Sequence, residues 1–133
     1  MKIFIAFRFT GEDDKELKEN IQGICSSLEK AGHEHFCSYW KEDYYRKNNF
    51  TKKQILEHAF EELDKSDAVL AFVNSEERSE GMLLEIGYAL AKGKRFILAI
   101  RKGIRTTFIH QTADQIIEFE SMEELFERLR KIR

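Results

Sequence analysis

The sequence contains no proline, and neither an internal repeat nor a low-complexity linker divides its 133 residues. A chain of this length has the usual size of one domain, and it can bury a single hydrophobic core without disulfides or metal ions. We therefore expect one domain that spans residues 1–133.

Long apolar runs and an excess of one charge are also missing. No run approaches the roughly 20 apolar residues of a membrane-spanning helix, and the start MKIFIAFRFTGEDD lacks the features of a signal peptide. The 22 basic and 24 acidic residues nearly cancel to a net charge of -2, which argues against a nucleic-acid polymer or an anionic membrane as partner. We expect a cytoplasmic protein whose anion sites are local.

Cysteine is scarce, with two residues in the chain. Cys25 falls on the apolar face of a predicted helix and Cys37 lies near the end of a predicted strand, and neither a CxxC motif nor a nearby His pair at metal spacing accompanies them. We expect two reduced thiols in the core, no metal site and no cofactor.

What the sequence does contain is an alternation of two patterns. Continuous β-branched and aromatic runs predict five buried strands, over residues 2–7, 34–38, 68–73, 95–100 and 115–120. Apolar residues at helical spacing predict a helix that ends at Gly32, helices within residues 51–67 and 79–94, and a last helix from about Ser121, which with Glu124 forms a capping box. A short element is expected near TTFIHQTAD.

Strands that are apolar throughout and alternate with helices predict a parallel sheet covered on both faces. We expect an α/β fold, a three-layer flavodoxin-like sandwich whose five-stranded parallel sheet has the order 2-1-3-4-5. In this order, ligands bind at the carboxyl ends of the first and third strands, where the order reverses. The loops RFTGED (8–13) and NSEERSEG (74–81) should line that crevice.

The helix SEGMLLEIGYALAKGK (79–94) carries one unexpected charge. It is apolar almost all round from Met82 to Ala91, yet Glu85 lies in its middle, and a buried carboxylate is costly unless it is paired, hydrogen-bonded or protonated. Glu85 either reaches solvent or a cation such as Arg78 or Lys92, or acts as a catalytic carboxylate on a cationic, sugar-like transition state. The spacing alone does not decide between these interpretations.

The start of the same helix has the features of an anion site. Ser79 is placed to cap the helix, and Gly81 would let a ligand approach the backbone N-H groups of the first turn. These N-H groups and the helix dipole favour an anion such as a phosphate. Glu85 lies six residues beyond Ser79, about 9 Å along the helix axis.

The motif S-x-G-x-x-x-E-I-G-Y-A-x-A-x-G-K, which follows SDAVLAFV, resembles the nucleoside 2-deoxyribosyltransferase family and, within it, the small 2'-deoxynucleoside 5'-phosphate N-hydrolases. The likeness spans nearly the whole chain and includes the closing TADQIIEF. It implies that Glu85 is the nucleophile at the anomeric carbon and that Ser79 and Gly81 hold the sugar or the 5'-phosphate. The substrate would be a nucleoside or nucleotide, and the protein a hydrolase or a transferase.

The resemblance also implies further binding residues. The loop after the first strand wraps the nucleotide in this family, and its binding positions match Phe7, Phe9, Thr10 and Gly11. The family's sites are shared in a homodimer, and the residue that reaches the neighbouring subunit's site corresponds to Thr106, with Thr107 next to it. A homodimer is also expected because residues 82–91 are apolar on more faces than one sheet can cover.

Three positions depart from the family pattern. Phe4 replaces a Tyr that helps to orient the nucleophile, Ala59 replaces an Asp that serves the leaving base, and Phe7 replaces a glycine of the first loop. His58 is a candidate acid in place of that Asp, because an imidazole can protonate a departing base near neutral pH. More often, a histidine in such a position is an ordinary helix-surface residue.

Charge and aromatic side chains near the expected crevice bear on the substrate. Arg8, Arg101, Lys102 and Arg105 follow strands and could provide local positive charge for a 5'-phosphate, which favours a nucleotide. The segment YWKEDYYRKNNF (39–50) is too irregular for an assignment, and its five aromatics could form a lid or dimer contact or stack on a base.

Two other functions stay open at this point. A TIR-like domain that cleaves NAD with a comparable helix Glu is compatible with the opening FIAFRFTGEDD. A nucleotide-binding sensor or interaction domain without turnover is compatible with the replacements at Phe4 and Ala59.

Overall fold

The fold is described by a computed structural model that covers residues 1–9 and 11–133. Five parallel strands form one sheet in the order β2-β1-β3-β4-β5, which confirms the expected topology. Each strand end lies within one residue of its predicted position. The strands are β1 (Lys2–Ala6), β2 (Glu34–Cys37), β3 (Ala68–Val73), β4 (Arg95–Arg101) and β5 (Gln115–Phe119).

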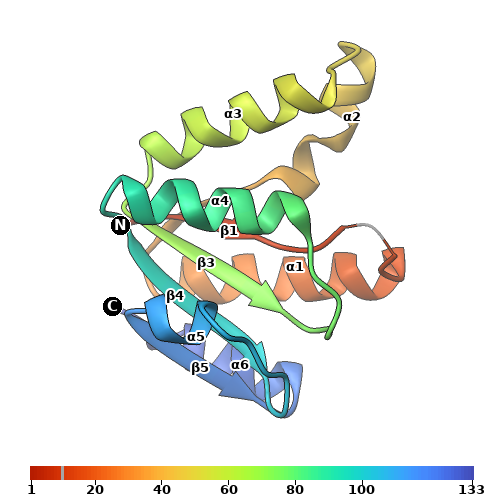
Figure 1. The fold of residues 1–133 in the computed structure, drawn as a ribbon. Coiled ribbons are helices and arrows are strands. Elements are labelled where there is room, and N and C mark those ends of the chain that lie inside the picture. The colour runs from red at the N-terminus through yellow and green to blue at the C-terminus, as the bar shows by residue number, and fades with distance from the viewer. Residues whose placement is uncertain (10) are drawn as a thin grey trace.

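Helices cover both faces of the sheet and complete the expected three layers (Figure 1). On one face lie α1 (Asp14–Lys30) and α6 (Met122–Leu129), and on the other lie α3 (Lys52–Asp64) and α4 (Glu80–Ala91). The segment between β2 and α3, which the sequence pattern left unassigned, forms a 3-10 turn η1 (Ser38–Lys41) and the short helix α2 (Glu42–Lys47). The short element expected before β5 is α5 (Ile109–Thr112).

Alternating side chains of the strands divide the core in two. In β1, Ile3 and Ile5 pack toward α1 and α6, whereas Phe4 and Ala6 pack toward α3 and α4. Cys25 and Cys37 are buried and free, and both belong to the cluster on the α1 side, as the sequence predicts. None of the helices in the described residues is long and apolar enough to cross a membrane.

The helices start where short polar side chains cap them. Ser79 accepts a hydrogen bond from Met82 N at 3.2 Å, which fixes the first turn of α4 at the predicted residue. Ser121 caps α6 in the same way, but the side chain of Glu124 accepts from Glu120 N and not from Ser121 N. The predicted capping box at Ser121 is therefore only half correct, because the returning carboxylate bonds one residue further upstream.

A glycine brings α1 and α6 together. At Gly23, a Cβ would lie 2.2 Å from the tip of the Phe126 ring, so the ring of α6 rests directly on the backbone of α1. This contact fixes how α1 and α6 pack together on their face of the sheet.

Candidate active site

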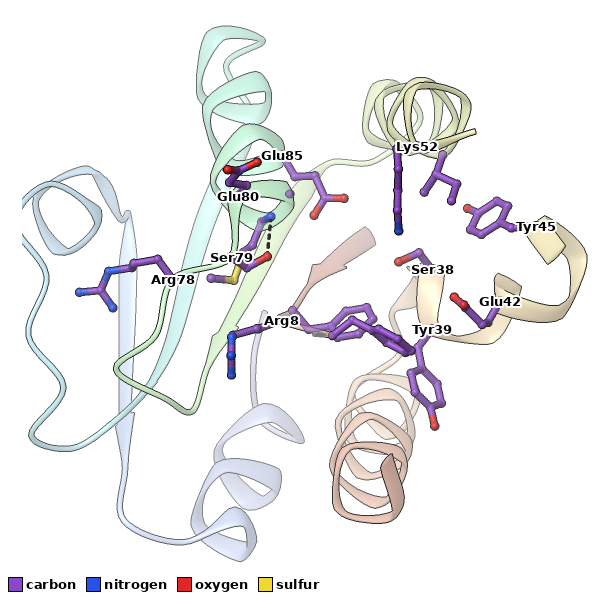
Figure 2. Close-up of a pocket in the computed structure, with 15 residues that line it drawn as sticks. Arg8, Ser38, Tyr39, Glu42, Tyr45, Lys52, Arg78, Ser79, Glu80 and Glu85 are labelled. Atoms are coloured by element: carbon purple, nitrogen blue, oxygen red, sulfur yellow. Dashed lines mark hydrogen bonds between the residues drawn. The ribbon is translucent and has the colours of Figure 1, made fainter. Parts of the chain in front are cut away.

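A cavity of about 560 Å³ opens at the carboxyl ends of β1 and β3, where the sequence predicts a crevice. Both predicted loops contribute to its wall, and the segment from Ser38 to Ile55 closes the opposite side (Figure 2). The lining residues are Phe7, Arg8, Phe9, Ser38, Tyr39, Glu42, Tyr45, Lys52, Ile55, Arg78, Ser79, Glu80, Gly81, Met82 and Glu85.

Glu85 is the partly buried carboxylate of this cavity, and it points from α4 into the open space (Figure 2). Neither cation that the sequence offers as its partner is paired with it, since Arg78 bonds the carbonyl oxygens of Glu76 and Arg105, and Lys92 lies 3.9 Å from Asp64. Burial raises the pKa of Glu85 from 4.5 to about 8. A carboxyl group in this state is suited to act on a ligand rather than to stabilise the fold.

The N-terminus of α4 forms the neighbouring wall. The hydroxyl of Ser79 is engaged in the helix cap, while Gly81 lines the cavity and a Cβ there would meet no atom closer than 4.0 Å. The backbone at the first turn is thus open to a ligand. Arg78 also lines the cavity, but its guanidinium extends away from the centre toward the loop after β4 (Figure 2).

The loop after β1 contributes two aromatic side chains and one arginine. Phe7 and Phe9 line the cavity and meet edge-on, with ring centroids 6.5 Å apart. Arg8 is paired with Glu77 and Glu12, and the left-handed Gly11 (φ 83°) lies against it, since a Cβ at Gly11 would be 2.7 Å from the guanidinium. Gly11 itself is outside the lining of the cavity, and Thr10 lies outside the described residues.

The far wall contains polar residues that sequence reasoning did not single out. Ser38 follows β2, Glu42 lies on α2 and Lys52 begins α3, and their side chains point toward the space in front of Glu85 (Figure 2). The aromatic Tyr39 and Tyr45 lie in the same wall. The segment that follows β2 starts at the same edge of the sheet as the two predicted loops, and this position could have indicated that it lines the cavity. Residues 39–50 show no regular period, so the sequence pattern did not predict which of their side chains face the cavity.

Two of the three replaced family positions, Phe4 and Ala59, lie in the core, whereas Phe7 lines the cavity. Phe4 is 1 % and Ala59 is 2 % exposed, and both pack in the cluster between the sheet and the helices α3 and α4. His58 does not line the cavity. It stands behind the cavity wall, where its Nδ1 lies 2.7 Å from the hydroxyl of Tyr45.

The structure separates Arg101, at the end of β4, and the basic residues that follow it from this chain's cavity. Arg101 donates to Asn74 and to the carbonyl of Glu120, Lys102 pairs with Glu120, and neither lines the cavity. Arg105, whose carbonyl accepts from Arg78, is also outside the lining. Arg8 is therefore the one member of the predicted basic group among the lining residues. Thr106 forms hydrogen bonds with His110 at the start of α5.

No group of three or more His, Cys, Asp or Glu side chains within residues 1–9 and 11–133 is arranged to hold a metal ion. Glu85 stands at the centre, an open helix N-terminus lies on one side of it, and a wall with Lys52, Glu42 and two tyrosines lies on the other.

Comparison with known proteins gives a consistent result. The family model described as nucleoside 2-deoxyribosyltransferase matches residues 3–123. The structure is similar to a CMP N-glycosidase, BcmB, from Clostridium botulinum, with a TM-score of 0.72 and 21% identity over 97% of each chain. It is also similar to a 2-deoxyribosyltransferase from Bacillus psychrosaccharolyticus, with a TM-score of 0.68 and 19% identity over 97% of this chain and 96% of that one. Among curated proteins, none matches the sequence.

Proposed function

Because the chain belongs to the nucleoside 2-deoxyribosyltransferase family, we propose that it cleaves or exchanges the N-glycosidic bond of a (deoxy)nucleoside or its 5'-monophosphate, with Glu85 as nucleophile. The observation that carries this proposal is the partly buried carboxyl group of Glu85 in the cavity, which has no ion-pair partner among residues 1–9 and 11–133. A structural carboxylate in such a place would be matched by a cation, and neither Arg78 nor Lys92 provides one.

In the proposed reaction, a carboxylate oxygen of Glu85 attacks C1' while the C1'–N bond breaks and its electron pair leaves with the base. The negative carboxylate stabilises the oxocarbenium-like transition state and then forms a glycosyl-enzyme. Water that attacks C1' of this intermediate makes the protein a hydrolase, and a second base makes it a transferase. Glu85 must be ionised for this step, and the side chain of Lys52 points into the same space (Figure 2).

We place the sugar and its 5'-substituent at the N-terminus of α4. The open backbone at Gly81 and the cap at Ser79 support this placement, and Phe7, Phe9, Thr10 and Gly11 are assigned to the same side from the family pattern. A nucleotide is supported over a nucleoside by this open helix N-terminus rather than by Arg8, which lines the wall but is already paired with Glu12 and Glu77. The name of the similar BcmB protein, a CMP N-glycosidase, agrees with a nucleotide substrate.

We further propose a homodimer in which Thr106 reaches the partner's site. Three leucines of α4 are exposed, Leu83 at 39%, Leu84 at 52% and Leu90 at 36%, and Phe108 at 76% stands two residues beyond Thr106. Such apolar exposure is typical of a surface that a second copy covers. Sedimentation at micromolar concentration should give the mass of a dimer and Leu84→Glu that of a monomer, whereas a monomeric wild type would contradict both the dimer and the role of Thr106.

A second candidate function is a nucleotide-binding sensor without turnover. It is favoured by the apolar side chains of Phe4 and Ala59, which place neither a hydroxyl nor a carboxylate near Glu85. A TIR-like activity that cleaves NAD is the third candidate.

One panel experiment separates these functions. The protein is incubated with deoxynucleoside monophosphates, deoxynucleosides and NAD, and free base or nicotinamide is measured. Release from a nucleotide or nucleoside that is abolished by Glu85→Gln, but kept in the exposed control Glu61→Gln, supports the proposal. Release from NAD alone supports the TIR-like activity, and thermal stabilisation by a ligand without release supports the sensor.

A further inference from the structure

Tyr45 forms part of the cavity wall on the side opposite Arg8 (Figure 2). Its side chain extends from α2 and is 4% exposed, held by the ring of Phe50 at 5.1 Å and by the imidazole of His58 at 5.6 Å between centroids. Its hydroxyl lies 2.7 Å from His58 Nδ1. The phenol is therefore fixed by packing on its faces and by a hydrogen bond at its tip.

Behind Tyr45 the polar contacts continue away from the cavity. Nε2 of His58 lies 3.7 Å from Glu62 Oε1, and the other oxygen of Glu62 accepts a hydrogen bond from Lys2 Nζ at 3.2 Å. Burial opposes the ionisation of Glu62, but the hydrogen bond and charge of Lys2, helped by Lys65 and His58, lower its pKa below the ordinary value. Glu62 is thus a carboxylate that can stabilise a protonated His58.

The proposed reaction needs a proton for the departing base, and Tyr45 in the cavity wall, with His58 and Glu62 behind it, could supply that proton. The departing base carries the electron pair of the broken C1'–N bond, and a positioned acid typically contributes about 10²- to 10⁴-fold in rate. The residue that serves the base in the family pattern is Ala59 here, whose methyl group is buried. Its neighbour His58 does not line the cavity, but it contacts Tyr45, which does.

We propose that Tyr45 donates a proton to the departing base and that His58, held by Glu62, replaces that proton. The inference rests on the proposed function of the same cavity. In this step the phenolic proton moves to a nitrogen or oxygen of the base as the C1'–N bond breaks, and the Nδ1 proton of the His58 imidazolium moves to the phenolic oxygen. The base leaves in its neutral form, and His58 is left neutral with its Nε2 proton toward Glu62.

The surroundings of Tyr45 explain why His58 is required. Burial raises the pKa of Tyr45 to about 12, and smaller contributions come from the negative charges of Glu62, Glu85 and Glu42 and from Tyr44. The phenol therefore keeps its proton at neutral pH, but it is too weak an acid to release that proton alone. In the proposed relay, His58, whose Nδ1 lies 2.7 Å from the phenolic oxygen, supplies a second proton as the first departs. From β2, the ring of Phe36 covers the edge of His58 and shields it on that side.

The test compares two leaving groups on the same sugar phosphate. Once the panel has identified the base, its release is measured from the ordinary nucleotide and from an activated nucleotide whose base needs no proton to depart. For a guanine nucleotide the activated base is N7-methylguanine, and for a uracil nucleotide it is 5-nitrouracil. Tyr45→Phe should slow the ordinary substrate by about 10²- to 10⁴-fold and the activated one by less than about 10-fold. His58→Gln should show the same selectivity, and the exposed neighbour control Tyr44→Phe should affect neither substrate.

A structural role would give a different result, since a distorted cavity slows both substrates equally. An equal loss on the two substrates in both variants, or no loss in either, overturns the relay. If Glu85→Gln abolishes base release and Tyr45→Phe shows no selectivity, the relay alone fails. If the wild type releases no base even from the activated nucleotides, the proposed function fails, and the relay fails with it.

Discussion

Replacement of Glu85 by Gln should stabilise the folded protein at alkaline pH while it removes the proposed nucleophile. Burial raises the pKa of Glu85 from 4.5 to about 8 in the folded protein. Between these two pKa values Glu85 binds more protons in the folded state than in the unfolded state, so its contribution to the free energy of unfolding of the wild type falls as the pH rises. Glutamine has no proton to lose, and the variant should lack this part of the pH dependence.

The magnitude follows from the two pKa values. Each pKa unit corresponds to about 1.4 kcal/mol, so the full effect is about 5 kcal/mol, of which about 4 kcal/mol should be lost between pH 5 and pH 9. Urea unfolding of both proteins without ligand, at pH 5, 7 and 9 and one protein concentration, measures this difference. The exposed control Glu61→Gln should keep the wild-type pH dependence.

The result that would refute this reasoning is equally definite. If Glu85→Gln and the wild type lose the same free energy between pH 5 and pH 9, the carboxyl group is ionised in the folded protein at neutral pH. Burial would then not oppose its ionisation, and the argument from a costly buried carboxyl group would fail, although the proposed nucleophile needs this ionised form.

Two further predictions concern packing and the far wall of the cavity. Gly23→Ala should lower the free energy of unfolding by about 1–3 kcal/mol, because the new methyl group would overlap the Phe126 ring, while the exposed neighbour Gln22→Ala should change it by less than about 0.5 kcal/mol in urea unfolding. Equal effects of the two would show that the ring gives way freely. Lys52→Met should weaken nucleotide binding by about 10-fold in calorimetry, since a charge-assisted hydrogen bond contributes about 1.5 kcal/mol or more, and Lys53→Met should leave binding unchanged. Unchanged affinity in the Lys52 variant would place the ligand elsewhere.

The sheet could be predicted from the sequence because its strands are buried on both faces. The run AVLAFV (68–73) is apolar throughout and is bounded by polar residues, so its ends can be read from the sequence. Every residue of β3 is buried. The helix cap at Ser79 could also be predicted, because serine is a preferred residue immediately before the first turn of a helix. These elements fixed the crevice between β1 and β3 and the position of Glu85 in it.

The sequence did not predict where the basic side chains at the end of β4 point. Side chains of a strand alternate between faces, and Arg101 therefore lies on the side of Ile97 and Ala99, where its guanidinium stacks over Phe119 at 5.1 Å. It ends on the α1 and α6 side of the sheet, away from Glu85. Proximity to a strand end predicted the correct edge of the sheet, but it did not predict the direction of the side chain.

Residues 39–50 escaped prediction for a different reason. η1 and α2 are too short to show a helical period, and their conformation depends on contacts with distant residues, such as the hydrogen bond between Tyr45 and His58 on α3. The sequence indicated an aromatic segment at the crevice. Which of its rings face the cavity depended on tertiary packing that no local pattern records.

The central claim, that Glu85 forms a glycosyl-enzyme, is tested most directly by locating the covalent bond. The protein is incubated with a nucleotide whose 2-fluoro-arabinosyl sugar slows breakdown of the intermediate, and it is then digested and analysed by mass spectrometry. The proposed mechanism predicts one added sugar phosphate on the peptide that contains Glu85 and none in Glu85→Gln. Base release from this nucleotide with the sugar attached to any other residue would contradict it.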